Sequence, residues 1–212
     1  MPSDLLDVQQ NGLLAKGLYS EFKEALSGSF CTRCALSQNR THIVVDRGNP
    51  RAKVMIIGEA PGQNEDLTGQ AFVGRAGRLL DEMLHNLGFD TNRDALIVNV
   101  VKCRPPENRA PTPGEAEECL PFLKKQIELV NPGLIALLGA TALKYLLPDN
   151  KDFPMASQAG RCFQSPNYPG KELMVLYHPA YILRDPRKKP LMAEHLRQLV
   201  VIAGRLTARE RK

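Results

Sequence analysis

Cysteines are the residues whose type and spacing most directly suggest chemistry in this sequence. The chain has five of them; Cys31 and Cys34 form a C-x-x-C pair, and Cys103 and Cys119 follow later with fifteen residues between them. Four thiolates at such positions can form a metal site that is closed by the fold rather than by a local ribbon. The spacing does not distinguish zinc from an iron–sulfur cluster. Cys162 has no companion and is interpreted as an ordinary thiol.

A thioredoxin-type redox pair is the alternative interpretation of Cys31 and Cys34. That motif normally follows a strand and opens a helix, whereas here Ser29-Phe30 and a helical pattern precede the pair. The odd cysteine count, without a recognisable signal peptide at the N-terminus, argues against a disulfide framework and indicates a reducing compartment.

Polar residues follow apolar runs at several other points, and these runs are the elements that must position them. Each run is apolar throughout, as is typical of strands covered on both faces. The runs span residues 54–57, 95–101, 134–138 and 173–177. Helical patterns over 75–87, 112 onward, 140–147 and 190–206 alternate with them. This alternation predicts a parallel sheet with helices on both faces.

Local signals support the helices. Thr112 can cap a helix that Pro113 opens, and Glu115 completes a capping box; Gly88 is a natural stop for the helix over 75–87. Residues 5–27 indicate a helical lead-in, and residues 148–171 a long loop with room for a short hairpin.

The carboxyl ends of the expected strands carry the candidate site, because ligands of open parallel sheets bind there. The first strand precedes the loop 58–62, and the second holds Asn99 near its end, followed by Lys102, Cys103 and Arg104. The fourth precedes His178. A turn or cap would explain each residue alone, but their convergence on one edge favours a ligand site.

The loop 58–62, Gly-Glu-Ala-Pro-Gly, is neither a dinucleotide fingerprint nor a P-loop. Its glycines suggest a tight loop whose backbone amides face a ligand. Further on, Phe72 stands among small residues and could be a stacking plate for a base or a core side chain under a loop.

Basic charge gathers at the C-terminus. The chain has a net charge of +5, and residues 184–212 hold nine Lys/Arg against three Asp/Glu. A basic segment on a nearly neutral body favours a nucleic-acid partner, with a solvated helix as the alternative. The composition is that of a globular protein, and no apolar run is long enough to span a membrane.

Several segments together resemble the family 4 uracil-DNA glycosylases, the iron–sulfur branch of that superfamily. The matching segments are 58–62 with Glu65-Asp66, 72–77, 99–106, 108–113, 135–139 and 178–186. The cysteines Cys31, Cys34, Cys103 and Cys119 match as well. The resemblance covers residues 30–206, and it implies a three-layer α/β/α sandwich on a four-stranded parallel sheet. It also implies a [4Fe–4S] cluster on Cys31, Cys34, Cys103 and Cys119. Residues 1–29 are then a helical lead-in and 207–212 a basic tail.

The resemblance also assigns roles at the site. It places Gly58, Glu59, Ala60 and Gly62 at the uracil pocket, with Phe72 under the base, Asn99 at the uracil edge and His178 facing uracil O2. The segment through Leu183 and Arg184 resembles the loop that enters the DNA minor groove. Lys102 and Arg104 are expected to contact DNA with them.

These residue types suit the implied reaction. The amide of Asn99 can accept from uracil N3–H and donate to O4, and cytosine presents the opposite pattern. A donor at O2 from His178 would stabilise the departing uracil anion, as an oxyanion hole does.

The sequence leaves two candidates for the residue that activates water. The best-known branch of the superfamily has an Asp where this chain has Ala60, an absence that family 4 shares. Glu59 is the first candidate and Glu65 the second.

Three functions remain in competition. The leading one is a monofunctional uracil-DNA glycosylase that acts on single- or double-stranded DNA, as a monomer in a bacterial or archaeal cytosol at the nucleoid. The second is an iron–sulfur protein that only binds uracil-containing DNA or a repair partner, and the third is a four-thiolate zinc protein. One offshoot of the superfamily binds uracil-containing DNA irreversibly through a basic insert. The sequence has no such insert between Gly77 and Asn99, which favours an enzyme that turns over.

Overall fold

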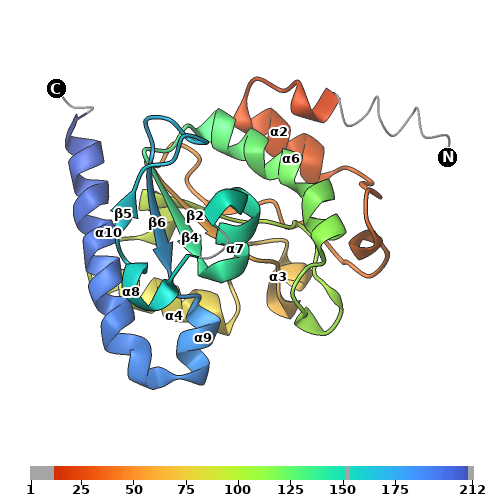
Figure 1. Ribbon diagram of the computed structural model, residues 1–212. Helices are drawn as coiled ribbons and strands as arrows, with labels where there is room; N and C mark the ends of the chain where they lie inside the picture. Colours follow the sequence, from red (N-terminus) through yellow and green to blue (C-terminus); the bar gives the residue numbers. More distant parts are fainter. Residues whose placement is uncertain (1–11, 151–152, 210–212) are drawn as a thin grey trace.

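The computed structural model describes residues 12–150 and 153–209. Its centre is a sheet (Figure 1), and the strands follow one another across the sheet in the order β1-β3-β2-β4-β6-β5. The expected strands are all present and run parallel to one another. They are β2 (Val54–Gly58), β3 (Ala95–Asn99), β4 (Leu134–Leu138) and β6 (Glu172–Leu176).

The expectation of a four-stranded, wholly parallel sheet is wrong, because the sheet has six strands. β1 (Arg47–Gly48) and β5 (Cys162–Phe163) add an antiparallel strand at each edge. Each of these strands has only two residues and no apolar run, so the sequence has no hydrophobic periodicity that would predict it. Gly48 fits β1 because its φ is +105° and a Cβ there would lie 2.3 Å from the carbonyl oxygen of Ala95.

Helices cover both faces of the sheet, which makes three layers (Figure 1). On one face α2 (Tyr19–Ser27), α6 (Pro113–Val130) and α7 (Gly139–Leu146) pack against sheet residues such as Met55 and Ile57. On the other, α4 (Arg75–His85), α9 (Pro179–Arg184) and α10 (Lys189–Arg209) pack against their strand neighbours Val54 and Ile56. Strand side chains alternate between the two cores, as the pleat requires.

The capping predictions are confirmed. Thr112 caps α6 with its hydroxyl accepting from the Glu115 N–H, and the Glu115 carboxylate accepts from the Thr112 N–H at 2.8 Å. Gly88 follows α4 with a φ of +76°. Of the expected helix over 5–27, residues 1–11 lie outside the described part, and the described part holds α2.

Short elements escaped the sequence analysis. The expected loop 148–171 contains η3 (Pro148–Asn150), α8 (Met155–Gln158) and β5. The remaining ones are α3 (Gln63–Thr68), α5 (Thr91–Asp94), α9 (Pro179–Arg184), η1 (Ala35–Gln38), η2 (Pro106–Asn108) and η4 (Pro186–Lys188). In the part of the chain that the structure describes, no helix combines the length and apolar character needed to cross a membrane.

Candidate functional site

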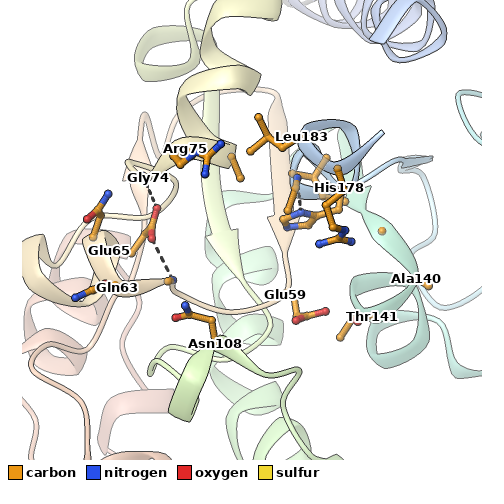
Figure 2. A pocket seen from close by; sticks show the side chains of 17 residues that line it. Glu59, Gln63, Glu65, Gly74, Arg75, Asn108, Ala140, Thr141, His178 and Leu183 are labelled. Atoms are coloured by element: carbon orange, nitrogen blue, oxygen red, sulfur yellow. Dashed lines mark hydrogen bonds between the residues drawn. The ribbon is translucent and has the colours of Figure 1, made fainter. Parts of the chain in front are cut away.

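A cavity of about 670 Å³ lies where the carboxyl ends of β2, β4 and β6 meet (Figure 2). Six of the residues expected at the site line it: Glu59, Gly62, Glu65, His178, Leu183 and Arg184. The strand ends therefore converge as the parallel topology predicts.

His178 follows β6 and is the N-cap of α9. Its Nδ1 accepts a hydrogen bond from the Ala180 N–H at 3.1 Å. Burial, aided by the charge of Arg184, lowers the pKa of His178 to about 4. The imidazole is therefore neutral near pH 7, and because Nδ1 is an acceptor, the proton must sit on Nε2. His178 thus presents one neutral N–H donor.

Asn99 is the last residue of β3 and is 1% exposed. Neither its Oδ1 nor its Nδ2 has a hydrogen-bond partner among the described residues. Such an unsatisfied buried amide costs free energy, and it is unusual enough to indicate a ligand that pairs with it. A planar group with an adjacent donor and acceptor would satisfy both atoms.

Phe72 lies beside this amide. A Cβ on Gly58 would come within 2.5 Å of the Phe72 ring and 2.6 Å of Asn99 Oδ1, so glycine lets both side chains meet at the end of β2. Phe72 has a φ of +55°, which is uncommon for an aromatic residue. Its ring centroid is 5.8 Å from that of His178. Ring, amide and imidazole therefore form one cluster beside the cavity.

Glu65 is bound within the fold, which argues against a role in activating water. One of its carboxylate oxygens accepts from the Gly74 N–H at 2.6 Å and the other from the Gly62 N–H at 3.1 Å (Figure 2). It ties the loop after β2 to the start of α4, and its oxygens are engaged. Glu59 also lines the cavity, and no hydrogen bond joins its carboxylate to the other lining residues drawn in Figure 2.

Leu183 and Arg184 lie on the helix α9 rather than on an irregular loop. Leu183 is 37% exposed, although it is a large apolar residue at the cavity wall. Arg104 is partly exposed and donates from Nε to Asn108 Oδ1 at 2.8 Å.

The prediction that Lys102 contacts DNA is wrong. Lys102 is 1% exposed, and its ammonium donates to the carbonyl oxygen of Asn99 at 2.6 Å and to Gln126 Oε1 at 2.5 Å. A polyanion cannot reach a group held in this way. The sequence alone does not reveal it, because a lysine after a strand ordinarily points to solvent.

Four cysteines line one small, largely apolar cavity, although they are far apart in the sequence. They are Cys31, Cys34, Cys103 and Cys119. Lys102 N–H donates to Cys119 Sγ at 3.3 Å, and Arg40 donates to Cys103 Sγ at 3.5 Å. Burial raises the pKa of Cys103 to about 11 and that of Cys119 to about 12. Two thiols with donors aimed at their sulfurs fit a group that binds thiolates.

Among the described residues, no group of three or more His, Cys, Asp or Glu side chains is placed to hold a metal ion. The structure therefore brings the four cysteines to one cavity but, within the part of the chain that it describes, shows no metal centre there.

Several cavity residues were missed by the sequence analysis. They include Gln63, Asn64, Arg75, Asn108 and Thr141. Arg75 and Asn108 belong to segments 72–77 and 108–113, but no pattern distinguishes either residue from an exposed polar one. Outside the matching segments, Thr141 becomes part of the site only because α7 begins beside β6.

Comparisons with known proteins give matches over most of the chain. Residues 45–201 match the family described as the uracil DNA glycosylase superfamily. A type-4 uracil-DNA glycosylase of Thermotoga maritima is 46% identical over 155 residues, which are 73% of this chain and 79% of that protein. The type-4 enzymes of Pyrobaculum aerophilum and Archaeoglobus fulgidus are 41% and 37% identical, each over 82% of this chain and over 88% and 89% of their own lengths.

Proposed function

The chain belongs to the uracil-DNA glycosylase superfamily, and from this premise we propose that it removes uracil from DNA by hydrolysing the N-glycosidic bond. The observation that carries the proposal is the buried amide of Asn99, whose donor and acceptor are both unpaired among the described residues. Strand cleavage is not part of the reaction, which leaves an abasic site.

Recognition rests on matching the amide to the base. Uracil offers N3–H as a donor and O4 as an acceptor, which pair with Asn99 Oδ1 and Nδ2. Cytosine offers an acceptor and a donor at the same places, so both contacts would be mismatched. Since the target base is stacked in a duplex, the nucleotide must leave the helix, and Phe72 would stack against the extruded base.

Bond cleavage requires stabilisation of the leaving group. As the C1′–N1 bond breaks, its electron pair stays on uracil and positive charge develops on the sugar. The neutral His178 would donate Nε2–H to uracil O2 as it becomes anionic. A fixed donor next to a forming anion acts electrostatically, without transferring its proton.

Water then bonds to C1′ and loses a proton. Glu59 is the candidate acceptor for that proton, because it lines the cavity and its carboxylate makes no hydrogen bond to the other lining residues drawn in Figure 2. Ala60 has no group that could do this. The departing uracil anion takes up a proton from solvent, so the balance is one water consumed per base released.

DNA binding falls to groups at the cavity rim. Leu183 and Arg184 on α9 are exposed there, and Arg104 is a further candidate for a phosphate. Leu183 would fill the space that the flipped nucleotide leaves. We expect a monomer in the cytosol to act on both single- and double-stranded DNA.

The cysteine cage would hold a [4Fe–4S] cluster through Cys31, Cys34, Cys103 and Cys119. What supports this is the convergence of the four thiols on one small, largely apolar cavity. Such a cluster, when bound, would supply structural cross-linking between the N-terminal segment, the loop after β3 and α6. No step of the reaction requires it.

The deciding experiment incubates the chain with oligonucleotides that contain a single uracil, with matched cytosine and thymine oligonucleotides as controls. Release of free uracil over several turnovers, with an intact but alkali-labile strand, is the expected result. A stable one-to-one complex without release would instead identify a protein that only binds uracil-containing DNA. An absorbance shoulder near roughly 400 nm would identify the iron–sulfur cluster, and its absence with bound zinc would refute it.

A further inference from the structure

The proposed function leaves one prominent group unexplained, the buried ammonium of Lys102. Its side chain is among the largest that are fully buried in the described chain. Its hydrogen-bond partners are two neutral oxygens, the Asn99 carbonyl and Gln126 Oε1. Burying an ammonium costs several kcal/mol unless its surroundings compensate. The acidic groups that act on it electrostatically are those of Cys119, Asp46 and Cys103, yet among the described residues the ammonium donates to the two neutral oxygens, which suggests that Lys102 has a specific task there.

That task follows from the state of Asn99. Because its side-chain amide has no hydrogen bond within the described residues, no polar contact fixes the orientation of the amide before a ligand arrives. Its position must come from packing against Phe72 and Gly58 and from the backbone that carries it. Asn99 ends β3, where the ladder stops, and its own carbonyl is the group that Lys102 grips.

Lys102 is itself firmly anchored. Gln126 on α6 is fully buried and donates from Nε2 to the Val45 carbonyl and to Tyr19 Oη, each at 3.0 Å. Tyr19 Oη in turn donates to Asp46 at 2.8 Å. The chain of bonds therefore runs from the end of β3 through α6 to α2, all on one face of the sheet.

The backbone of Lys102 makes a second connection. Its N–H donates to Cys119 Sγ, so one residue touches both the cysteine cage and the strand end that carries the reading amide. The loop after β2 is tied to the same segment, since Val101 N–H donates to the Glu59 carbonyl at 3.2 Å.

We propose that Lys102 is a positioning residue that holds the Asn99 amide in register for uracil by clamping the Asn99 carbonyl from inside the protein. The inference rests on the proposed function, since it gives Asn99 the task of reading the base. Removing the ammonium frees the peptide after Asn99 and leaves two buried oxygens unpaired. Binding of uracil then weakens, whereas contacts at the cavity rim with the DNA backbone do not.

The test compares Lys102→Met with Lys23→Met, both in the iron-loaded full chain. Methionine keeps the length of the side chain and removes its charge. Lys23 is a matched control because it belongs to the same network through Asp46, at 2.7 Å, but makes no contact with Asn99. Equilibrium dialysis with radiolabelled uracil measures base binding without requiring catalysis, and fluorescence anisotropy measures binding of abasic-site DNA.

Lys102→Met is expected to weaken uracil binding at least about tenfold, because both amide hydrogen bonds are misplaced. Its affinity for abasic-site DNA and its iron content should stay within about twofold of wild type, since neither depends on the amide. Lys23→Met should leave both affinities unchanged. Uracil binding within twofold of wild type in a folded, iron-loaded Lys102→Met protein would overturn the inference.

Gln126→Met serves if Lys102→Met does not fold. It removes one of the two ammonium partners, so uracil binding should weaken by roughly threefold or more, and an unchanged value would overturn the inference. Base release by the wild-type chain is measured in parallel. Its absence would count against the proposed function, whereas the ratio of uracil affinities between variant and wild type tests Lys102 alone.

Discussion

Substitution of His178 by alanine tests the chemistry most directly. The imidazole offers a single donor, Nε2–H, because Nδ1 is engaged with the Ala180 N–H. Loss of one donor to a developing oxyanion costs about 10²–10³ in rate, or about 2.7–4 kcal/mol. The same change removes the N-cap of α9, which should lower the free energy of unfolding by about 1 kcal/mol.

The assay is single-turnover release of uracil from single-stranded DNA at saturating enzyme, since saturation removes any effect on binding. His178→Asn is the matched control, because asparagine caps helices well and should restore stability while its shorter amide fails to reach uracil O2. We expect both variants to lose rate and only His178→Ala to lose stability. A rate within tenfold of wild type for His178→Ala would refute the role of this residue.

The pH dependence of the same residue gives an independent measurement. Because the pKa of His178 is lowered to about 4, the reactive neutral form persists well below pH 6.5, and the release rate should show no inflection from His178 near that value. A histidine that is neutral when folded contributes stability that is complete above pH 6.5 and is lost as pH falls towards 4. Between pH 6.5 and pH 4, the free energy of unfolding should fall by ~3 kcal/mol relative to that of His178→Asn. Denaturant titrations at these two pH values would measure the difference.

Four further substitutions test the remaining assignments. Asn99→Asp should nearly abolish uracil release because a carboxylate cannot donate to O4, and full activity in the base-release assay would show that the pocket is wrongly assigned. Phe72→Ala should weaken binding of uracil-containing DNA by about 1–3 kcal/mol, measured by anisotropy against abasic-site DNA. Cys103→Ala should lose iron and thermal stability together, and a stable, iron-free, active protein would contradict a structural cluster. Arg184→Ala should raise the dissociation constant mainly for duplex substrate, so equal losses on single strands would exclude a role in holding the duplex open.

Local signals in the sequence were sufficient to predict the elements whose defining residues lie close together in the chain. The capping box of Thr112 and Glu115 could be read directly because its partners are three residues apart. The central strands were visible because burial on both faces demands continuous apolar runs. The edge strands β1 and β5 had no such signal, since two residues paired at an edge bury too little to impose a pattern.

The site residues also divide into those whose place the sequence indicated and those whose contacts it could not reveal. Residue types and strand ends indicated His178, Asn99 and the cysteines, and the parallel topology was enough to expect them at one edge. The bonds of Glu65 and Lys102 could not be foreseen, because a carboxylate or an ammonium in a sequence carries no sign of whether it faces water or the backbone.

The sequence by itself thus determined which chemical groups this protein has and where along the chain its central strands lie, because side-chain type and hydrophobic period are local properties. Only the tertiary structure decided what each group is free to do. It engaged Glu65 and Lys102 with backbone groups, left the amide of Asn99 unpaired among the described residues, and fixed the proton of His178 on Nε2. Hydrogen bonding and burial depend on neighbours that are distant along the chain, and those neighbours exist only once the sheet and its two helical layers have assembled.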